Sequence, residues 1–365
     1  MSILILNAGS SSLKAALFEA DGITALYRAQ VAGLGTAPRL SLDGETAALP
    51  DDTDHAAALA ALISPLEDAV ASIGHRVVHG GALFTEPTVL DDESRPALGA
   101  LSALAPLHNP PALAVIDAVA EAIPGVVQVA CFDTAFHARQ PAEALRFALP
   151  TDDRTVGLQR YGFHGLSYEG LVEALDPVPP RLLACHLGNG ASLCAIRDGR
   201  SVATTMGYAP LGGLTMGTRV GEIDPAAVLE LARRVGVEEA GRLLTEEAGL
   251  LGLSSESSDM AVLAASGREE AAFARRHFAY WVARQAGSMI AAMGGIDAIA
   301  FTGGIGENDG AIRTAIGGHL SWTGLRLAEE VAADGDLAAP ESTVAAWVVP
   351  ADEEAVIARR VAALV

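Results

Sequence analysis

The sequence predicts an α/β protein with two domains built on one duplicated unit. Its 365 residues are enough for two domains, and 50% of them are hydrophobic, which allows a large core. Glycine is abundant (38 residues) and only 5% of the chain is aromatic. That composition is typical of α/β proteins with many tight turns. A strand–turn–strand pattern at the start of the chain also recurs in its second half, which indicates the duplication.

The first copy of this pattern opens the chain. An apolar run at 3–6 leads through the turn NAGSSS, residues 7–12, into Lys14 and a second apolar run at 15–18. Two apolar runs joined by small residues predict a β-hairpin. Hydroxyl and backbone N–H groups in such a turn can donate to phosphate oxygens, and Lys14 adds a positive charge. A plain hairpin with a polar turn is the alternative.

The second copy lies between residues 181 and 199. A strand at 181–186 is followed by the glycine-rich turn LGNGAS, residues 187–192, and by a returning strand at 193–196. The pattern serine, leucine, any residue, alanine occurs in both copies, and an Asp-Gly turn follows each of them. Two such hairpins indicate a duplicated fold that binds a nucleotide between its halves.

Two charged residues lie beside predicted buried strands. Arg76 stands in the apolar run 73–79, and Asp133 directly follows the buried strand 126–132. An arginine in an apolar strand is costly unless it is paired or holds an anion. In α/β folds, chemistry collects at the carboxyl ends of strands. The alternatives are an arginine on the solvent face of an edge strand and an aspartate that only caps the next segment.

Glycine-rich segments supply the remaining candidates. His164 lies in a loop between glycines, and Arg219 ends a long glycine-rich loop that begins near residue 204. Loops of this length in a compact domain usually serve a function. Farther on, the strand 299–302 leads into a glycine-rich loop at 303–308 and a helix from about residue 310, an arrangement suited to a nucleotide.

Long helices and the cysteines complete the structural expectations. Helices are predicted at 226–248 and 268–294, with a final helix after Glu354. Cys131, Cys185 and Cys194 lie in apolar strand contexts, which predicts reduced core residues and not a zinc site.

Charge excludes some classes of partner. The formal net charge is −21 and the sequence pI is about 4.7, which argues against nucleic acid or an anionic membrane as a partner. From the sequence we expect neither a secretory signal nor a segment that spans a membrane. We therefore expect a cytoplasmic protein whose few cations gather in one cleft.

Taken together, these segments resemble the acetokinase family of short-chain carboxylate kinases. The resemblance runs nearly end to end and is carried, in the family's order, by NAGSSSLK, GHRVVHGG, PLHNPP, FDTAFH, RYGFHG, CHLGNGAS, MGTR, FTGGIGEN and a closing Glu-Glu pair. It implies the duplicated fold that actin, sugar kinases and Hsp70 share, with ribonuclease-H-like domains around a cleft. The expected domains are residues 1–149 with 351–365, and residues 150–350.

The resemblance also implies an activity. The expected reaction is the reversible, Mg²⁺- or Mn²⁺-dependent transfer of the γ-phosphoryl group of ATP to acetate, in a homodimer formed through the second domain. A kinase for propionate or another short carboxylic acid is the nearest alternative. A nucleotide-gated protein of the actin or Hsp70 type, without metabolic turnover, is the other.

Individual roles follow from the resemblance only. The expected magnesium ligands are Asn7 and Glu353, with Glu354 as the alternative to Glu353. The expected catalytic residues are Arg76, Asp133, His164 and Arg219, and acetate is expected to contact Arg76, Val78, Leu107, Phe163 and Pro210. The expected ATP-binding residues are Ser10, Ser12, Lys14, His186, Leu187, Gly188, Asn189, Gly190, Asp259, Met260, Ala261, Gly304, Ile305, Gly306, Glu307 and Asn308.

The chain departs from the family pattern at three places, one of which is Val220, in place of a usual small polar residue after Arg219. Ala261 stands where similar proteins usually have an arginine that helps to cover the adenosine. Residues 166–168, Leu-Ser-Tyr, replace a polar and histidine pattern after His164.

Overall fold

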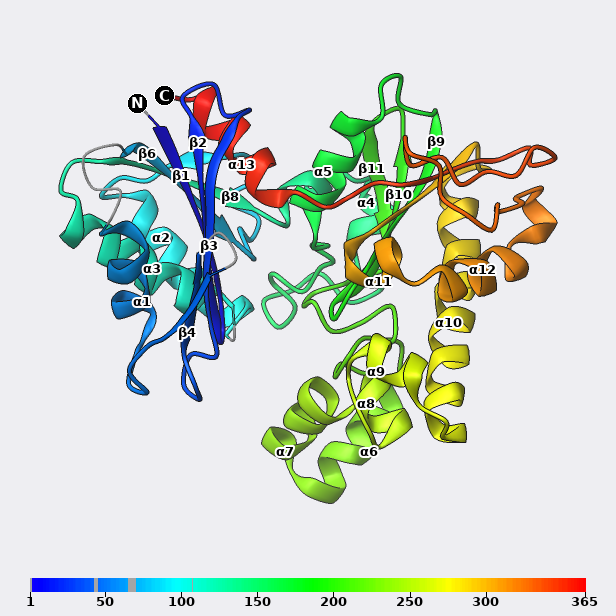
Figure 1. Cartoon of the computed structure of the whole chain (residues 1–365). Helices are drawn as coiled ribbons and strands as arrows, with labels where there is room; N and C mark the ends of the chain where they lie inside the picture. The colour runs from blue at the N-terminus through cyan, green and yellow to red at the C-terminus, as the bar shows by residue number, and fades with distance from the viewer. Residues whose placement is uncertain (1, 43–44, 65–69, 107) are drawn as a thin grey trace. The chain divides into compact units, whose positions relative to one another are not determined.

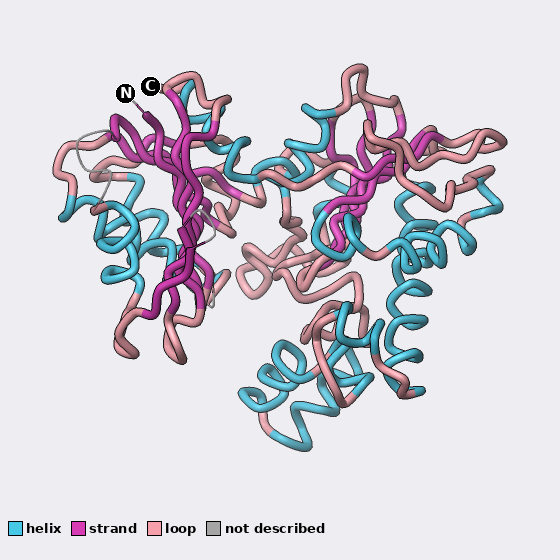
Figure 2. The backbone as a smooth tube through the Cα atoms, viewed as in Figure 1, coloured by secondary structure: helices cyan, strands magenta, loops and turns pink. Residues whose placement is uncertain are grey.

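The computed structural model describes residues 2–42, 45–64, 70–106 and 108–365. The chain divides into two compact units, which Figure 1 shows in full. Unit 1 comprises residues 1–138 and 352–365, and unit 2 comprises residues 139–351. Each unit combines one β-sheet with helices, as the colouring of Figure 2 shows, so the predicted α/β class is confirmed. The predicted domain limits at 149/150 and 350/351 stay a prediction.

Unit 1 contains an eight-stranded sheet and several helices. Its strands are β1 (Ser2–Gly9), β2 (Ser12–Glu19), β3 (Ala25–Ala32), β4 (Arg39–Leu42), β5 (Glu45–Ala48), β6 (Val70–Val77), β7 (Thr88–Val89) and β8 (Val127–Phe132). Its helices are α1 (His55–Ile63), α2 (Ser94–Ala100), α3 (Asn109–Ala122) and α13 (Glu353–Ala362), with short 3₁₀ turns η1 (Leu101–Leu104) and η2 (Ala135–His137).

The sheet of unit 1 has the strand order β5-β4-β3-β2-β1-β6-β8-β7. Strands β1 to β5 form an antiparallel meander, whereas β6 and β8 run parallel to β1. Because side chains alternate along a strand, Leu4 and Leu6 of β1 face one side of the sheet. There they pack in a core with residues of α1 and α3.

The final helix, α13, packs on β1 and β6. This close approach depends on Gly74 of β6, because a Cβ atom there would lie 2.6 Å from a methyl group of Ile357 and 2.8 Å from Ile5 Cδ1. Apolar positions of α13 recur at helical spacing (Val356, Ile357, Val361) and are buried. The last residues of the chain therefore pack beside strands from its beginning, as Figure 1 shows.

Next to Gly74, the neutral imidazole of His75 is buried in the sheet. Only 2% of His75 is exposed, its Nε2 lies 2.8 Å from Gln128 Oε1, and burial lowers its pKa to about 4. An unfolded chain, with a histidine pKa near 6.5, binds this proton more readily than the folded one. The contribution of neutral His75 to the free energy of unfolding is therefore fully present above about pH 6.5 and is lost as the pH falls toward 4.

We expect acid to destabilise the wild type more than a His75→Gln variant, which cannot take up this proton. The difference between their free energies of unfolding should change by about 3 kcal/mol between pH 7 and pH 4, at about 1.4 kcal/mol per pH unit. Urea unfolding at several pH values measures this difference, with the exposed His319→Gln as the control. A pH-independent difference between the wild type and His75→Gln would contradict the assignment.

Unit 2 contains a five-stranded sheet and more helices. Its strands are β9 (Arg181–Leu187), β10 (Ala191–Arg197), β11 (Arg200–Thr204), β12 (Ala298–Thr302) and β13 (Ala345–Val348). Its helices are α4 (Ala142–Leu145), α5 (Gly165–Ala174), α6 (Pro225–Val235), α7 (Val237–Arg242), the π-helical turn η3 (Leu243–Glu247), α8 (Gly249–Ser254), α9 (Met260–Ala265), α10 (Glu269–Met293), α11 (Gly303–Asn308), α12 (Gly310–His319) and the 3₁₀ turn η4 (Ser321–Thr323).

The sheet of unit 2 repeats the topology of unit 1. Its order is β11-β10-β9-β12-β13, with β9, β10 and β11 antiparallel and with β12 and β13 parallel to β9. In unit 1, β3-β2-β1-β6-β8 has the same order and directions. The two predicted hairpins are β1–β2 and β9–β10, at the centre of each sheet. The predicted duplication is confirmed.

Two sequence predictions in unit 2 were wrong. The helix expected at 226–248 is broken at Gly236, whose φ of 91° ends α6 before α7 begins. The glycine-rich loop expected at 303–308 is itself the short helix α11. This segment packs on β9 and β12, and tertiary contacts of this kind override the weak helix propensity of glycine.

The structure confirms that the three cysteines are reduced core residues. Cys131, Cys185 and Cys194 are free and fully buried. None of the helices within the described residues is long and apolar enough to cross a membrane.

Candidate active site

A buried ion pair between Arg76 and Asp133 connects the ends of the neighbouring strands β6 and β8. Arg76 near the end of β6 donates from Nε to Asp133 Oδ1 at 3.0 Å and from Nη2 to Asp133 Oδ2 at 2.6 Å. Strands β6 and β8 are parallel neighbours, and the Asp133 amide donates to Val77 O at 3.1 Å. The adjacent strand ends therefore bring the two residues together, and the bidentate contact fixes the plane of the guanidinium.

Burial and charge set the protonation of this pair. Burial disfavours the charged guanidinium, but the Asp133 and Glu353 carboxylates outweigh it and raise the Arg76 pKa. Burial also raises the Asp133 pKa, to about 6, although Arg76 opposes the change. At neutral pH the pair is therefore ionic. The side chain of Asp133 is 1% exposed and that of Arg76 is 20% exposed, so only the arginine keeps some accessible surface.

Two side-chain oxygen atoms flank the guanidinium of Arg76. Asn7 Oδ1 accepts from Arg76 Nη1 at 3.3 Å, and Glu353 Oε2 lies 3.2 Å from Arg76 Nε. Asn7 lies within β1 opposite Lys14 of β2, so the turn itself is confined to Ser10 and Ser11. The structure thus brings the two predicted magnesium ligands to one arginine.

These oxygens fit magnesium chemically. Magnesium prefers oxygen ligands and commonly takes only one or two from the protein, with the remainder from water and phosphate. In the part of the chain that the structure describes, no group of three or more His, Cys, Asp or Glu side chains could hold a metal ion. A magnesium ion at Asn7 and Glu353 would therefore need substrate or water oxygens as well.

A second cluster in unit 2 centres on two stacked imidazoles. The rings of His164 and His186 lie 4.0 Å apart between centroids, at an angle of 25°. His164 Nδ1 lies 2.9 Å from Ser192 Oγ, which in turn lies 2.5 Å from the hydroxyl of Tyr168. His186 Nδ1 lies 2.8 Å from Ser167 Oγ. These contacts hold the two rings in place.

Gly190 marks where groups of this second cluster converge. A Cβ atom at Gly190 would lie 3.2 Å from His164 Nε2 and 3.5 Å from Arg219 Nη1. Arg219 also donates from Nη1 to Pro210 O at 3.0 Å, and burial lowers its pKa. An arginine remains charged nonetheless. Two groups suited to phosphate oxygens therefore lie beside the glycine-rich turn between β9 and β10.

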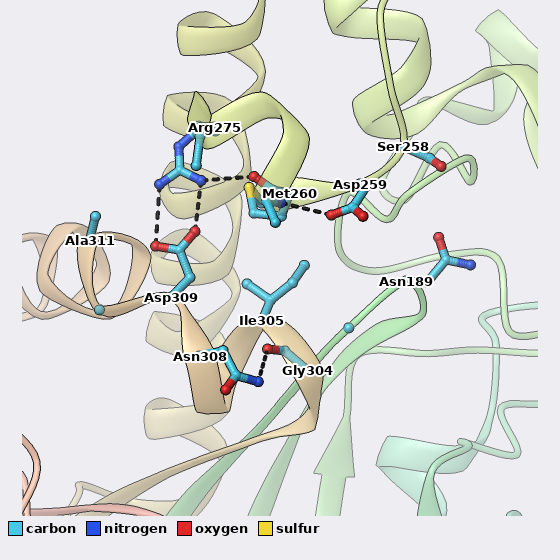
Figure 3. A pocket seen from close by; sticks show the side chains of 14 residues that line it. Asn189, Ser258, Asp259, Met260, Arg275, Gly304, Ile305, Asn308, Asp309 and Ala311 are labelled. Carbon is cyan, nitrogen blue, oxygen red and sulfur yellow. Dashed lines mark hydrogen bonds and ion pairs between the residues drawn. The ribbon is translucent and has the colours of Figure 1, made fainter. Parts of the chain in front are cut away.

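A pocket of about 1060 Å³ lies in the same unit, and Figure 3 shows the side chains around it. Its walls come from the turn after β9, from the start of α9 and from α11. The predicted ATP residues that line it are Gly188, Asn189, Asp259, Met260, Ala261, Gly304, Ile305 and Asn308. A cavity of this size suits a nucleotide.

Other predicted ATP residues lie away from this lining. Leu187 is fully buried in β9 and Gly306 is buried in α11, while Glu307 accepts from the amides of Gly303 (2.9 Å) and Ala351 (3.0 Å). Gly190 and His186 belong to the histidine cluster. Their roles toward ATP, like those of Ser10, Ser12 and Lys14 in unit 1, stay predictions.

The predicted acetate residues divide between the units. Val78 follows β6 in unit 1 and is 7% exposed, Phe163 is buried in unit 2, and Pro210 of unit 2 holds Arg219 through its carbonyl oxygen. Leu107 lies outside the described residues. A common pocket formed by these side chains stays a prediction.

Sequence reasoning missed several side chains that the structure places at the site. Ser192 and Tyr168 hold His164, and Arg275 and Asp309 line the pocket. One signal was readable for Arg275: it lies four residues after Ala271 and three before Phe278, both buried. A charged residue on the core-facing stripe of a helix needs a partner.

The duplicated sheets, the nucleotide-sized pocket and the paired arginine and carboxylate together are typical of phosphotransferases with a duplicated α/β fold. Residues 2–359 match the model of the acetokinase family. The chain is 43% identical to an acetate kinase of Rhodopseudomonas palustris (strain TIE-1), with 98% of this chain and 97% of the relative covered. The chain belongs to the acetokinase family.

Solved structures agree with this assignment. An acetate kinase from Porphyromonas gingivalis has a TM-score of 0.87 at 34% identity, with 98% of both chains covered. A propionate kinase from Francisella tularensis subsp. tularensis SCHU S4 has a TM-score of 0.92 at 32% identity, also with 98% of both chains covered. The predicted family and fold are confirmed.

Proposed function

We propose that this chain transfers the γ-phosphoryl group of ATP to acetate, reversibly, and forms acetyl phosphate and ADP. The observation that carries the proposal, beside membership of the family, is the Arg76–Asp133 pair. A buried carboxylate fixes the guanidinium of a side chain that stays 20% exposed, which is how a protein presents a positive charge to a small anion.

The reaction requires positive charge and correct positioning of the two substrates more than it requires a general base. Acetate is already ionised at neutral pH, and its approach to the γ-phosphoryl group is opposed by repulsion between anions. An acetate oxygen forms the new O–P bond while the bond to the bridging oxygen of ADP breaks, and that electron pair leaves with ADP. We assign Arg76 to acetate, and Arg219 and His164 to the charge on the transferring group.

The histidine contacts support this role for His164. Burial raises the pKa of Tyr168 well above its usual value, so its hydroxyl stays protonated and can donate to Ser192 Oγ. Ser192 can then donate to Nδ1 of His164, which leaves the proton of a neutral imidazole on Nε2, beside Gly190. A protonated Nε2 is a hydrogen-bond donor suited to a phosphoryl oxygen.

Asn7 and Glu353 are proposed to hold the magnesium ion, or manganese in its place, with Glu354 as the alternative to Glu353. When bound with ATP, such an ion would reduce the negative charge on the phosphate oxygens. Asp133 is proposed to act through Arg76, because both of its oxygens are engaged there. It then has no part in accepting a substrate proton.

ATP is proposed to occupy the pocket of unit 2, with its nucleoside near residues 259–261 and 304–308. Ser10, Ser12 and Lys14, together with the turn at 186–190, are proposed to contact its phosphates. The two compact units are proposed to be the two actin-like domains of the enzyme. A cytoplasmic homodimer is the proposed assembly.

Propionate is the second candidate acceptor, because one similar structure is a propionate kinase. Val78 is proposed as a wall of the pocket for the methyl group of acetate. One methylene group is worth only about 1–3 kcal/mol of discrimination in an apolar pocket. We therefore expect acetate to react fastest and propionate more slowly.

Trapping of the acyl phosphate with hydroxylamine tests the reaction. The purified chain is given MgATP with acetate, propionate, butyrate or no acid, and the hydroxamate is measured over time. Acetyl hydroxamate formed fastest is the expected result. If every acid gave only the no-acid background while ADP still bound, the transferase proposal would be wrong and a nucleotide-gated protein would take its place.

A further inference from the structure

Arg275 of α10 lies in the wall of the pocket of unit 2, as Figure 3 shows. Among the described residues that line this pocket, it is the one that carries a positive charge. Its Nη1 donates to Asp309 Oδ2 at 2.7 Å and to the carbonyl oxygen of Met260 at 3.2 Å, and its Nη2 donates to Asp309 Oδ1 at 3.2 Å. The side chains of Arg275 and Asp309 are each 16% exposed.

These contacts tie two separate segments of the chain together. Met260 is the first residue of α9, and Asp309 stands between α11 and α12. Asp309 is itself fixed, because its Oδ1 accepts from the Ile312 amide at 3.0 Å and so caps α12. One guanidinium therefore joins α10 to the two walls that face the pocket.

Two other residues of the wall at 259–261 do not form such a link. Ala261 follows Met260 and lines the pocket with a single methyl group. Asp259 is occupied as the N-terminal cap of α9, where its Oδ1 accepts from the Ala261 amide at 2.8 Å. The side chain of Arg275 therefore links the wall at 259–261 to the wall at 304–309.

We infer that Arg275 is a positioning residue for the nucleoside part of a purine nucleotide, and that it acts by holding the wall at 259–261 against the wall at 304–309. This inference rests on the proposed function, and it names the element that shapes its nucleotide site. Because Asp309 neutralises the guanidinium, Arg275 acts through geometry and not as a cation for phosphate. Loss of Arg275 should then lower the affinity for all nucleotides by the same factor, whatever their number of phosphates.

Arg275→Met tests the inference, since methionine keeps an unbranched side chain without hydrogen bonds or charge. We expect the Kd values for both ADP and AMP, measured by calorimetry without acetate, to rise about 10-fold, the loss typical of one set of charge-assisted hydrogen bonds. KM for ATP should rise similarly, while kcat and KM for acetate stay within about twofold.

Two further variants separate this role from a general structural one. Arg276→Met removes a neighbouring arginine of the same helix that is 60% exposed and pairs with Glu269, and it should bind ADP normally. Arg275→Lys keeps a donor that can reach one carboxylate oxygen, so it should restore part of the lost affinity. A purely structural role would instead change all kinetic constants together, kcat and KM for acetate included.

The inference is overturned if Arg275→Met binds ADP with normal affinity. It is also overturned if the loss is several-fold greater for ADP than for AMP, because that would indicate direct contact with phosphate. Failure of the proposed reaction gives a different pattern. The wild type would then form no hydroxamate with any acid, while ADP affinity would still fall in Arg275→Met and not in Arg276→Met.

Discussion

Replacement of Asp133 by asparagine is expected to lower kcat for acetyl phosphate formation by about 100- to 1000-fold, as for a lost preorganised charge contact. The amide keeps the size of the carboxylate but replaces one acceptor oxygen by an NH₂ group that faces the donors of Arg76. One of the two hydrogen bonds, at 3.0 Å and 2.6 Å, is then lost. Glu353, 3.2 Å from Arg76 Nε, would compete for the released guanidinium.

A loss of stability accompanies this change and must be separated from it. Removing one partner of a buried ion pair typically costs about 3–5 kcal/mol. The pocket proposed for the nucleoside is lined by residues of unit 2 and not by Asp133, so Asp133→Asn should still bind ADP normally if the protein is folded. Melting curves and ADP calorimetry therefore accompany the kinetics.

Asp117→Asn provides the matched control for Asp133→Asn. The side chain of Asp117 is 72% exposed, and its ion-pair contact with Arg95 is long, at 3.9 Å. Its loss should leave kcat unchanged, since exposed pairs contribute little. A turnover within about threefold of the wild type for Asp133→Asn would show that Arg76 does not depend on this carboxylate.

Arg219→Ala is the second variant with a large expected effect, again about 100- to 1000-fold in kcat, or roughly 3–4 kcal/mol in the barrier. Arg219 Nη1 and His164 Nε2 both approach Gly190, so the variant removes one of two groups that converge there. KM for ATP should change little, because the pocket proposed for the nucleoside is not lined by Arg219. The loss therefore appears in kcat, as for an interaction made mainly in the transition state.

The choice of control and companion variant makes the Arg219 result interpretable. Arg197→Ala removes an exposed arginine at the end of β10 and should be neutral. Arg219→Lys keeps the charge but not the planar fork, so it should recover only part of the activity. Near-normal turnover of Arg219→Ala would refute its assignment to the transferring phosphoryl group.

Local patterns determined the strands of this protein and part of its site. Pairs of apolar runs joined by turns of small residues predicted both hairpins, which form the centre of each sheet. Arg76 and Asp133 could also be predicted as partners, through the resemblance of the surrounding motifs to a known family. Arg76 lies near the end of one strand and Asp133 directly follows its neighbour, and parallel neighbouring strands end at one edge of a sheet.

Local reasoning failed at two segments that contain glycine. The glycine-rich segment 303–308 has low helix propensity and was predicted as a loop, but it forms α11 against β9 and β12. The predicted helix at 226–248 is split where Gly236 adopts a positive φ. A glycine permits either conformation, so the sequence alone did not decide which one each segment takes.

By itself, the sequence determined the family and the duplicated sheets, because these follow from contiguous motifs and short-range periodicity. It also determined Arg76 and Asp133 as candidates at the ends of neighbouring strands. Only the tertiary structure decided which side chains support the candidate site. Tyr168 reaches Ser192 across 24 positions of the chain, and Arg275 reaches Asp309 across 34. Such contacts depend on how helices pack against a sheet, and side-chain spacing along one segment does not encode that packing.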